Sequence, residues 1–177
     1  MELNPINAIS PVDGRYRKQV ESLSYYFSEA ALINFRVFVE IEYFIALCNL
    51  PLPQLAGIEK KQLSQLRLMF KNFTFNDAQE VKEIEAVTNH DVKAVEYFLK
   101  KQFDKLGLAK YREFVHFGLT SQDINNTAMP YALKQAMNEV VLPIYESLVD
   151  KLLKKSREWQ KVSMLARTHG QPASPTL

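Results

Sequence analysis

Three histidines are the residues of this sequence best suited to acid–base chemistry, because an imidazole can donate or accept a proton near neutral pH. Each lies in a short polar segment that interrupts a helical pattern: Thr88-Asn89-His90-Asp91, His116 shortly before Thr120-Ser121, and Thr168-His169-Gly170-Gln171. A single histidine is more often structural than functional. Three in similar segments, at helix starts or loops where backbone N–H groups favour anions, indicate a site for an anionic substrate.

Two further segments offer hydrogen-bond donors to an anion. In Ser10–Tyr16, proline and glycine favour a turn that presents Arg15 next to Tyr16. The arginine could clamp a phosphate or a carboxylate in its planar fork, or it could be a surface arginine beside a packing tyrosine. Thr120 and Ser121 precede an expected helix and could hold a carboxylate or cap the helix, and these two roles are compatible.

The spacing of possible ligands does not favour a metal site. The sequence has no HxxxH, HExxH or CxxC arrangement, so local helix geometry places no pair of ligands together. Its one cysteine, Cys48, falls on an expected apolar helix face, and no glycine-rich phosphate loop occurs. We therefore expect neither a metal nor a cofactor.

Composition narrows the class of protein. The 177 residues are 47% hydrophobic, which allows a sizeable core, and 22 basic against 20 acidic residues give a net charge of +2. The basic residues are scattered without a run that could follow a phosphate backbone, so nucleic acid is not an expected partner. No stretch has the roughly 18 consecutive apolar residues of a membrane span. A single cysteine and a start without a secretory pattern predict a cytoplasmic protein without membrane association.

Apolar residues recur at steps of three and four, which is typical of amphipathic helices. The first such helix should begin after the cap residue Ser28 and end before Pro51 and Pro53. The second should begin at Asp91 and end just before Gly107. No Asn-Gly or Asp-Gly turn lies between alternating apolar runs, so no β-hairpin is indicated.

A third, longer pattern begins later in the chain. Asp123 should cap this helix, Pro130 should kink or restart it, and the stripe should continue past another bend at Pro143. The pattern predicts an all-α fold, in which a small N-terminal helical domain (1–112) precedes the first long helices of a helical bundle (113–177).

Four segments together resemble the bacterial adenylosuccinate lyases of the fumarase/aspartase superfamily, in that family's order and spacing. They are SPVDGRY at Ser10–Tyr16, TNHDVKAVEYFLK at Thr88–Lys100, HFGLTSQDINN at His116–Asn126 and RTHGQPASPT at Arg167–Thr176. The HxGxTSxD pattern of the third segment and the THGQ pattern of the fourth recur across the superfamily, whereas the first two segments point to the adenylosuccinate branch. The resemblance covers the whole chain and identifies it as the N-terminal portion of such a lyase.

The resemblance implies a helical enzyme of purine biosynthesis that eliminates fumarate by cleaving a C–N bond. Its substrates would be adenylosuccinate, which gives AMP, and the succinylated aminoimidazole carboxamide ribotide (SAICAR), which gives AICAR. The family forms homotetramers whose active sites draw on three subunits. The family's mobile Gly-Ser-Ser loop has no counterpart in this sequence, so we expect this chain alone to be inactive and to expose the apolar stripe Met137–Leu152.

Roles carry over from the family residue by residue. His169 would be the acid that protonates the leaving nitrogen, while the base would be a serine of the missing loop. Seven residues are expected to bind substrate. Arg15 and Tyr16 would bind the phosphate, and Thr120 and Ser121 would bind the carboxylates. Asn89, His90 and Asp91 would also bind substrate, with His90 near the reacting groups. His116 is expected to have a supporting or structural role. Gln171 and Thr168 are further candidates, since either could contact the substrate or His169.

Two other interpretations remain open. Another lyase of the superfamily, such as argininosuccinate lyase, would share the elimination chemistry but should lack the phosphate clamp at Ser10–Tyr16. A non-enzymatic helical binding module would need only the amphipathic helices, and its histidines would be incidental.

Overall fold

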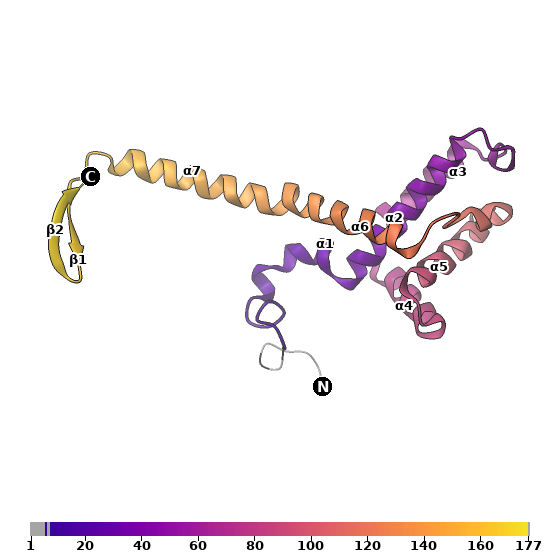
Figure 1. Ribbon diagram of the computed structural model, residues 1–177, viewed down its shortest axis with the longest axis horizontal. Coiled ribbons are helices and arrows are strands. Elements are labelled where there is room, and N and C mark those ends of the chain that lie inside the picture. Colours follow the sequence, from indigo (N-terminus) through magenta and orange to yellow (C-terminus); the bar gives the residue numbers. More distant parts are fainter. Residues whose placement is uncertain (1–5, 7, 177) are drawn as a thin grey trace. The chain divides into compact units, whose positions relative to one another are not determined.

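The computed structural model describes residue 6 and residues 8–176, and it confirms the expected helical fold. Helices α1 to α7 are joined by short 3-10 segments and one π-helical segment, and a two-stranded hairpin follows them (Figure 1). The α-helices and strands are α1 (Ser24–Phe27), α2 (Glu29–Cys48), α3 (Lys60–Lys71), α4 (Phe75–Thr88), α5 (Asp91–Lys105), α6 (Ser121–Ala136), α7 (Leu142–Trp159), β1 (Met164–Thr168) and β2 (Gln171–Thr176). The short segments are η1 (Arg17–Gln19), η2 (Glu21–Leu23), η3 (Pro53–Leu55), η4 (Ala109–Phe114) and η5 (Met137–Val141).

The chain divides into two compact units, residues 1–136 and 137–177, which are described separately below. Residues 113–136 fall in the first unit because α6 contacts α2. The domain boundary expected after residue 112 stays a prediction.

Helix α2 organises the first unit, since it contacts α1, α3, α4, α5 and α6. It begins as expected, because the Ser28 side chain accepts a hydrogen bond from the Ala31 N–H at 3.2 Å. Its apolar residues form a core with those of α5, and the Phe44 and Phe103 rings meet edge to face with centroids 4.8 Å apart. Small residues on α6, among them Ala128, let that helix pack closely on the other side of α2.

Helices α4 and α5 are joined by a tight turn that carries one of the histidine segments. Thr74 and Asp77 form a capping box at the start of α4, and α4 ends at Asn89, whose φ of 52° is left-handed. The chain then enters α5 at Asp91, as the sequence predicted, with His90 as the N-cap. After α5, Gly107 adopts a φ of 71°, the conformation that favours glycine after a helix.

The third helical pattern is confirmed, but its start differs from the prediction. Helix α6 begins at Ser121, so Asp123 lies in its first turn and is not the cap. Pro130 lies inside α6, which continues to Ala136. The π-helical segment η5 then precedes α7, where Pro143 occupies the first turn. Proline lacks an N–H and its ring crowds the carbonyl four residues earlier, so a wider π turn at that point relieves the conflict.

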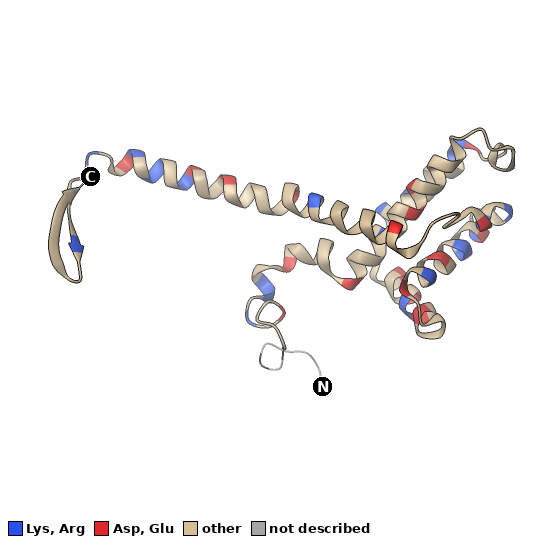
Figure 2. Cartoon of the chain, in the orientation of Figure 1, with Lys and Arg blue, Asp and Glu red and all other residues tan. Residues whose placement is uncertain are grey.

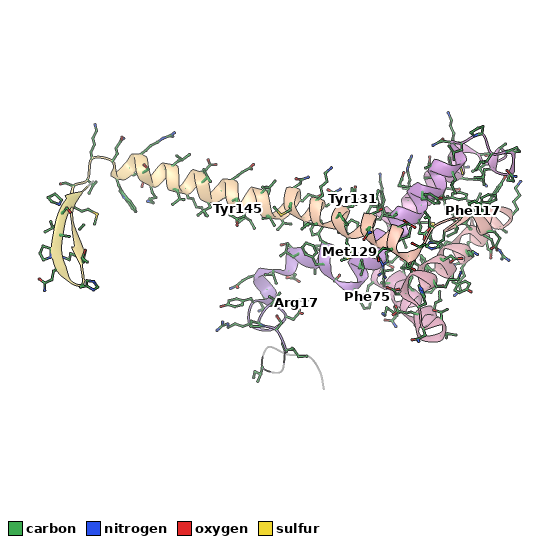
Figure 3. All side chains as sticks on the ribbon, viewed as in Figure 1. Arg17, Phe75, Phe117, Met129, Tyr131 and Tyr145 are labelled. Carbon is green, nitrogen blue, oxygen red and sulfur yellow. The ribbon has the colours of Figure 1, made fainter. Side chains whose placement is uncertain are left out.

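The second unit consists of η5, α7 and the hairpin. Helix α7 leaves large apolar side chains exposed, including Tyr145 (Figure 3) and Ile144, which is 64% exposed. This exposure confirms the expectation for the stripe Met137–Leu152 in the single chain. Acidic and basic residues are interspersed along α5 and α7 (Figure 2), as is usual for solvated helix faces. In the part of the chain that the structure describes, no helix is both long and apolar enough to cross a membrane.

The hairpin was not predicted. Strands β1 and β2 pair antiparallel, with Thr168 opposite Gln171, and the two residues between them, His169 and Gly170, have φ values of 51° and 79°. Positive φ at both central residues is the geometry of a type I′ turn, which suits the twist of a hairpin. Asn-Gly and Asp-Gly are the pairs that usually indicate such a turn, whereas this turn is built from His-Gly.

Candidate functional site

Two of the histidine segments meet around one hollow in the first unit, although 26 positions separate His90 from His116 in the sequence. The hollow has a volume of about 320 Å³. Its walls come from the start of α5 and from the loop that leads into α6: His90, Val92, Lys93, Glu96, His116, Leu119, Thr120 and Ser121. Four residues predicted to serve a site are therefore brought together: His90, His116, Thr120 and Ser121.

His90 is oriented by the helix that it caps. Its Nδ1 atom accepts a hydrogen bond from the backbone N–H of Lys93 at 3.2 Å, and its side chain is about half exposed. Since Nδ1 accepts, the proton of the neutral ring is on Nε2. His90 therefore offers a donor to a ligand in the hollow. Asn89, directly before it, sets the direction of the chain through its left-handed backbone.

Asp91 is engaged in a structural ion pair. Its Oδ2 atom accepts from Arg36 at 2.6 Å, its Oδ1 atom accepts from the Val92 N–H at 2.8 Å, and Arg36 also donates to Asn125 at 2.9 Å. Arg36 thereby links α2 to the first turns of α5 and α6. Although burial raises the pKa of Asp91, the Val92 N–H and the Arg36 charge outweigh it and bring the pKa below its ordinary value.

This lowered pKa makes a testable contribution to stability. Replacing Asp91 by Asn should lower the free energy of unfolding at pH 7 by about 1 kcal/mol, a modest figure because water screens a half-exposed carboxylate. A carboxylate with a lowered pKa stabilises the fold above its ordinary pKa of about 3.9, and this stabilisation is lost as the pH falls through the lower folded value. The difference between the two proteins should therefore shrink by pH 3 in urea titrations followed by circular dichroism.

Asp13→Asn is the control for this substitution, because Asp13 forms an exposed ion pair with Arg17 (Figure 3) at 2.8 Å. It should change stability by less than about 0.5 kcal/mol. A stability difference for Asp91→Asn that is equally large at pH 3 and pH 7 would contradict the role of the ion pair.

His116 is held by a buried carboxylate. Oε2 of Glu40 accepts the backbone N–H of His116 at 3.1 Å, and Oε1 lies 2.5 Å from Nδ1 of the same residue. The Glu40 side chain is fully buried and that of His116 is 16% exposed. Burial raises the pKa of Glu40, partly offset by the hydrogen bonds from His116. The hydroxyl of Tyr43, one turn further along α2, donates to the Phe117 carbonyl at 2.8 Å and holds the same loop.

Glu96 is a second buried carboxylate at the hollow, and it is paired with two lysines. Its oxygens contact Lys93 at 2.7 Å and Lys100 at 3.1 Å. Burial raises the pKa of Glu96, but the two lysines outweigh this and lower it overall. Lys93 lines the hollow and is 44% exposed, so it adds a positive charge that an anionic ligand could reach.

Sequence reasoning missed the three charged residues beneath this site. Within residues 6 and 8–176, the buried charged side chains are Arg36, Glu40 and Glu96. Glu96 lines the hollow, Glu40 holds His116, which also lines it, and Arg36 pairs with Asp91 directly after His90. Burying a charge is costly unless it is paired. The sequence did contain an indication of Arg36 and Glu40, because two charged residues one helical turn apart are unusual within the most apolar helix of the chain.

Thr120 and Asp123 form the start of α6. The Thr120 N–H and hydroxyl donate to Oδ2 of Asp123 at 2.7 and 2.9 Å, and these bonds lower the pKa of Asp123. The Thr120 hydroxyl thus donates to a side chain of the first turn and does not accept a backbone N–H of α6, so its capping role stays a prediction. Its hydroxyl oxygen and the half-buried Ser121 still border the hollow. In the described part of the chain, no three His, Cys, Asp or Glu residues lie together so as to hold a metal ion.

Arg15 and Tyr16 lie in the N-terminal loop and are not among the residues that line this hollow. The expected turn is present, since Gly14 N–H donates to the Ser10 carbonyl at 3.0 Å and Tyr16 N–H donates to the Pro11 carbonyl at 2.9 Å. The Arg15 guanidinium lies 4.6 Å from the centroid of the Tyr16 ring and donates to its hydroxyl at 2.8 Å. Both side chains are exposed, so the guanidinium has donors left for an anion.

His169 is at the tip of the hairpin in the second unit, with Thr168 and Gln171 as the flanking pair. All three are exposed. The turn presents the imidazole at the end of the hairpin, where a substrate or a second chain can reach it.

Left-handed backbone marks the predicted segments. In the part of the chain that the structure describes, the residues other than glycine with positive φ are Asn89 (52°), His116 (59°) and His169 (51°). This conformation is strained for histidine and persists where the surrounding structure imposes it, which happens most often at functional sites. One such residue lies in each of the three histidine segments.

Comparison with known proteins agrees with the resemblance seen in the sequence. The adenylosuccinate lyase of Dictyostelium discoideum is 50% identical over 181 residues, that of Legionella pneumophila strain Corby 43% over 178, and that of Escherichia coli K12 40% over 178. Each match covers 99% of this chain and 39% of the relative, so the chain spans about two fifths of the length of these curated relatives. The family described as Lyase matches residues 14–177. The chain therefore belongs to this lyase family.

Proposed function

We propose that this chain is the N-terminal part of an adenylosuccinate lyase of purine biosynthesis, which eliminates fumarate from adenylosuccinate and from SAICAR. The meeting of His90, His116, Thr120 and Ser121 around one hollow is the observation that carries the proposal. The identity of 40–50% to adenylosuccinate lyases of three organisms supports it. A cytoplasmic location and small-molecule partners, namely the two substrates and the products AMP, AICAR and fumarate, belong to the same proposal.

The reaction requires a base, an acid and a place for negative charge. A base removes a proton from the carbon next to a carboxylate, and an acid protonates the departing nitrogen. In the proposed mechanism His169 is the acid and a serine outside this chain is the base. Thr120, Ser121 and the start of α6 bind the succinyl carboxylates, where backbone N–H groups favour anions. His90 donates from Nε2 near the reacting groups, and Arg15 with Tyr16 binds the phosphate.

The proposed full-length enzyme is a homotetramer whose active sites draw on three subunits. The exposed apolar face of α7 supports this part of the proposal, since contiguous apolar surface of this kind usually marks an interface. The 177-residue chain is accordingly proposed to be inactive by itself.

The experiment is an assay of fumarate release by a full-length lyase that contains this chain, with adenylosuccinate, SAICAR and argininosuccinate as separate substrates. We expect turnover of the first two and none of the third, and no turnover by the 177-residue chain. Turnover of argininosuccinate alone would replace the proposal with a related lyase. Absence of turnover with all three would favour a binding module.

A further inference from the structure

Glu40 uses both carboxylate oxygens on a single residue. One oxygen accepts the backbone N–H of His116 at 3.1 Å, and the other lies 2.5 Å from Nδ1 of its ring. The two residues are 76 positions apart in the sequence, so this clamp joins the middle of α2 to the loop that precedes α6. No other buried carboxylate in the described chain has this arrangement, because Glu96 is paired with lysines.

Packing does not explain a carboxylate at this position. Three of its neighbours on α2, Val37, Ile41 and Phe44, are apolar and buried, and the Arg36 guanidinium one turn away is paired with Asp91, so a fully buried ionised group is costly at this position. A glutamine of the same shape has one acceptor oxygen, so it could not accept from the backbone N–H of His116 and from a protonated Nδ1 at once. Only a carboxylate offers acceptors to both at once.

The clamp acts on a residue that is strained and at the same time part of the hollow. His116 has a φ of 59°, which histidine adopts only when held there, and its ring lines the hollow with His90, Lys93, Thr120 and Ser121. Because Nδ1 is directed at Glu40, Nε2 is the ring nitrogen left for a ligand. The contact between α2 and α6 uses an apolar cluster around Phe35 and the Arg36–Asn125 hydrogen bond, and neither involves Glu40 or His116.

We infer that Glu40 is a positioning residue, which fixes the backbone and the ring of His116 so that Nδ1 carries a proton and Nε2 is presented to a polar group of the substrate. Glu40 itself does not reach the hollow, as its side chain is fully buried and absent from the lining. Only the expected effect of Glu40 on catalysis rests on the proposed function. The geometry of the pair is testable in this chain alone.

The first test is two-bond ¹H–¹⁵N NMR of the histidine rings in the 177-residue chain, which distinguishes a protonated from an unprotonated ring nitrogen. We expect a protonated Nδ1 at His116 and, in Glu40→Gln, loss of this state, because the amide cannot accept from both donors. The control is Glu42→Gln, the same substitution on the same helix, where the partner is Arg67 at 2.7 and 2.8 Å. It should leave the His116 signals unchanged.

An unprotonated Nδ1 in the unsubstituted chain would overturn the inference, and this measurement needs no variant that could fail to fold. Identical His116 spectra in the unsubstituted chain and in the Glu40→Gln chain would also overturn the inference.

The second test separates positioning from mere stability. In the full-length lyase, Glu40→Gln should lower kcat/KM about 10- to 100-fold, the usual effect of removing a group that orients an active-site histidine, while the enzyme remains folded at the assay temperature. Glu42→Gln should keep kcat/KM within about twofold of the unsubstituted enzyme. A folded Glu40→Gln enzyme with unchanged kcat/KM would overturn the positioning role. An unsubstituted enzyme without lyase activity would refute the proposed function instead, and the NMR result would stand apart from it.

Discussion

Replacing His169 by glutamine in a full-length lyase that contains this chain is expected to lower kcat by about 10²- to 10⁴-fold, the usual contribution of a positioned proton donor. Glutamine has a polar side chain of similar reach but cannot deliver a proton to the leaving nitrogen. The loss therefore belongs to the transition state, and KM should change little. Steady-state kinetics with adenylosuccinate measure both constants.

Arg15→Met is the contrasting variant. It removes a charge-assisted hydrogen bond to a phosphate that is remote from the bond being broken, so KM should rise more than kcat falls. Near-normal kcat in the His169→Gln enzyme would show that His169 is not the acid. His90, which offers a donor from Nε2, would then be the next candidate.

Phe44→Ala should lower the free energy of unfolding of the first unit by about 3–5 kcal/mol. The ring is 1% exposed and meets Phe103 edge to face, so its removal leaves a cavity between α2 and α5 and ends an aromatic contact. The same two helices carry Glu40 and His90. Urea titration of the 177-residue chain, followed by circular dichroism, measures the change.

The matched control is Phe75→Ala, because Phe75 is 75% exposed at the start of α4 (Figure 3). It should alter the free energy of unfolding by less than about 0.5 kcal/mol. Equal effects of the two substitutions would mean that the contact between α2 and α5 is not the core of this unit.

The features that depend on local sequence were predictable. The Ser28 cap, the prolines after Cys48 and the spacing of apolar residues located α2, and the same logic placed the start of α5 at Asp91. The cap, the prolines and the apolar spacing involve only residues that are close together in the sequence, so they can be recognised without the structure. The histidine segments were found in the same way, from polar residues that interrupt helical patterns.

The features that depend on distant residues were not predictable. Arg36 meets Asp91 across 55 positions and Glu40 meets His116 across 76, so nothing near either residue on α2 indicated its partner. The start of α6 was misplaced because Asp123 was taken as the cap, whereas its carboxylate reaches back to Thr120. The hairpin was missed because histidine occupies a turn position where asparagine or aspartate is usual.

If the proposed lyase activity holds, the left-handed backbone at Asn89, His116 and His169 should set thermal stability against turnover in a directed-evolution experiment on the full-length protein. Glycine adopts that conformation without strain, so a library screened only for heat resistance should accumulate glycine at these positions. A library screened for fumarate release should keep the imidazoles. The positions at which the two screens disagree would be those where the side chain serves the reaction and not the fold.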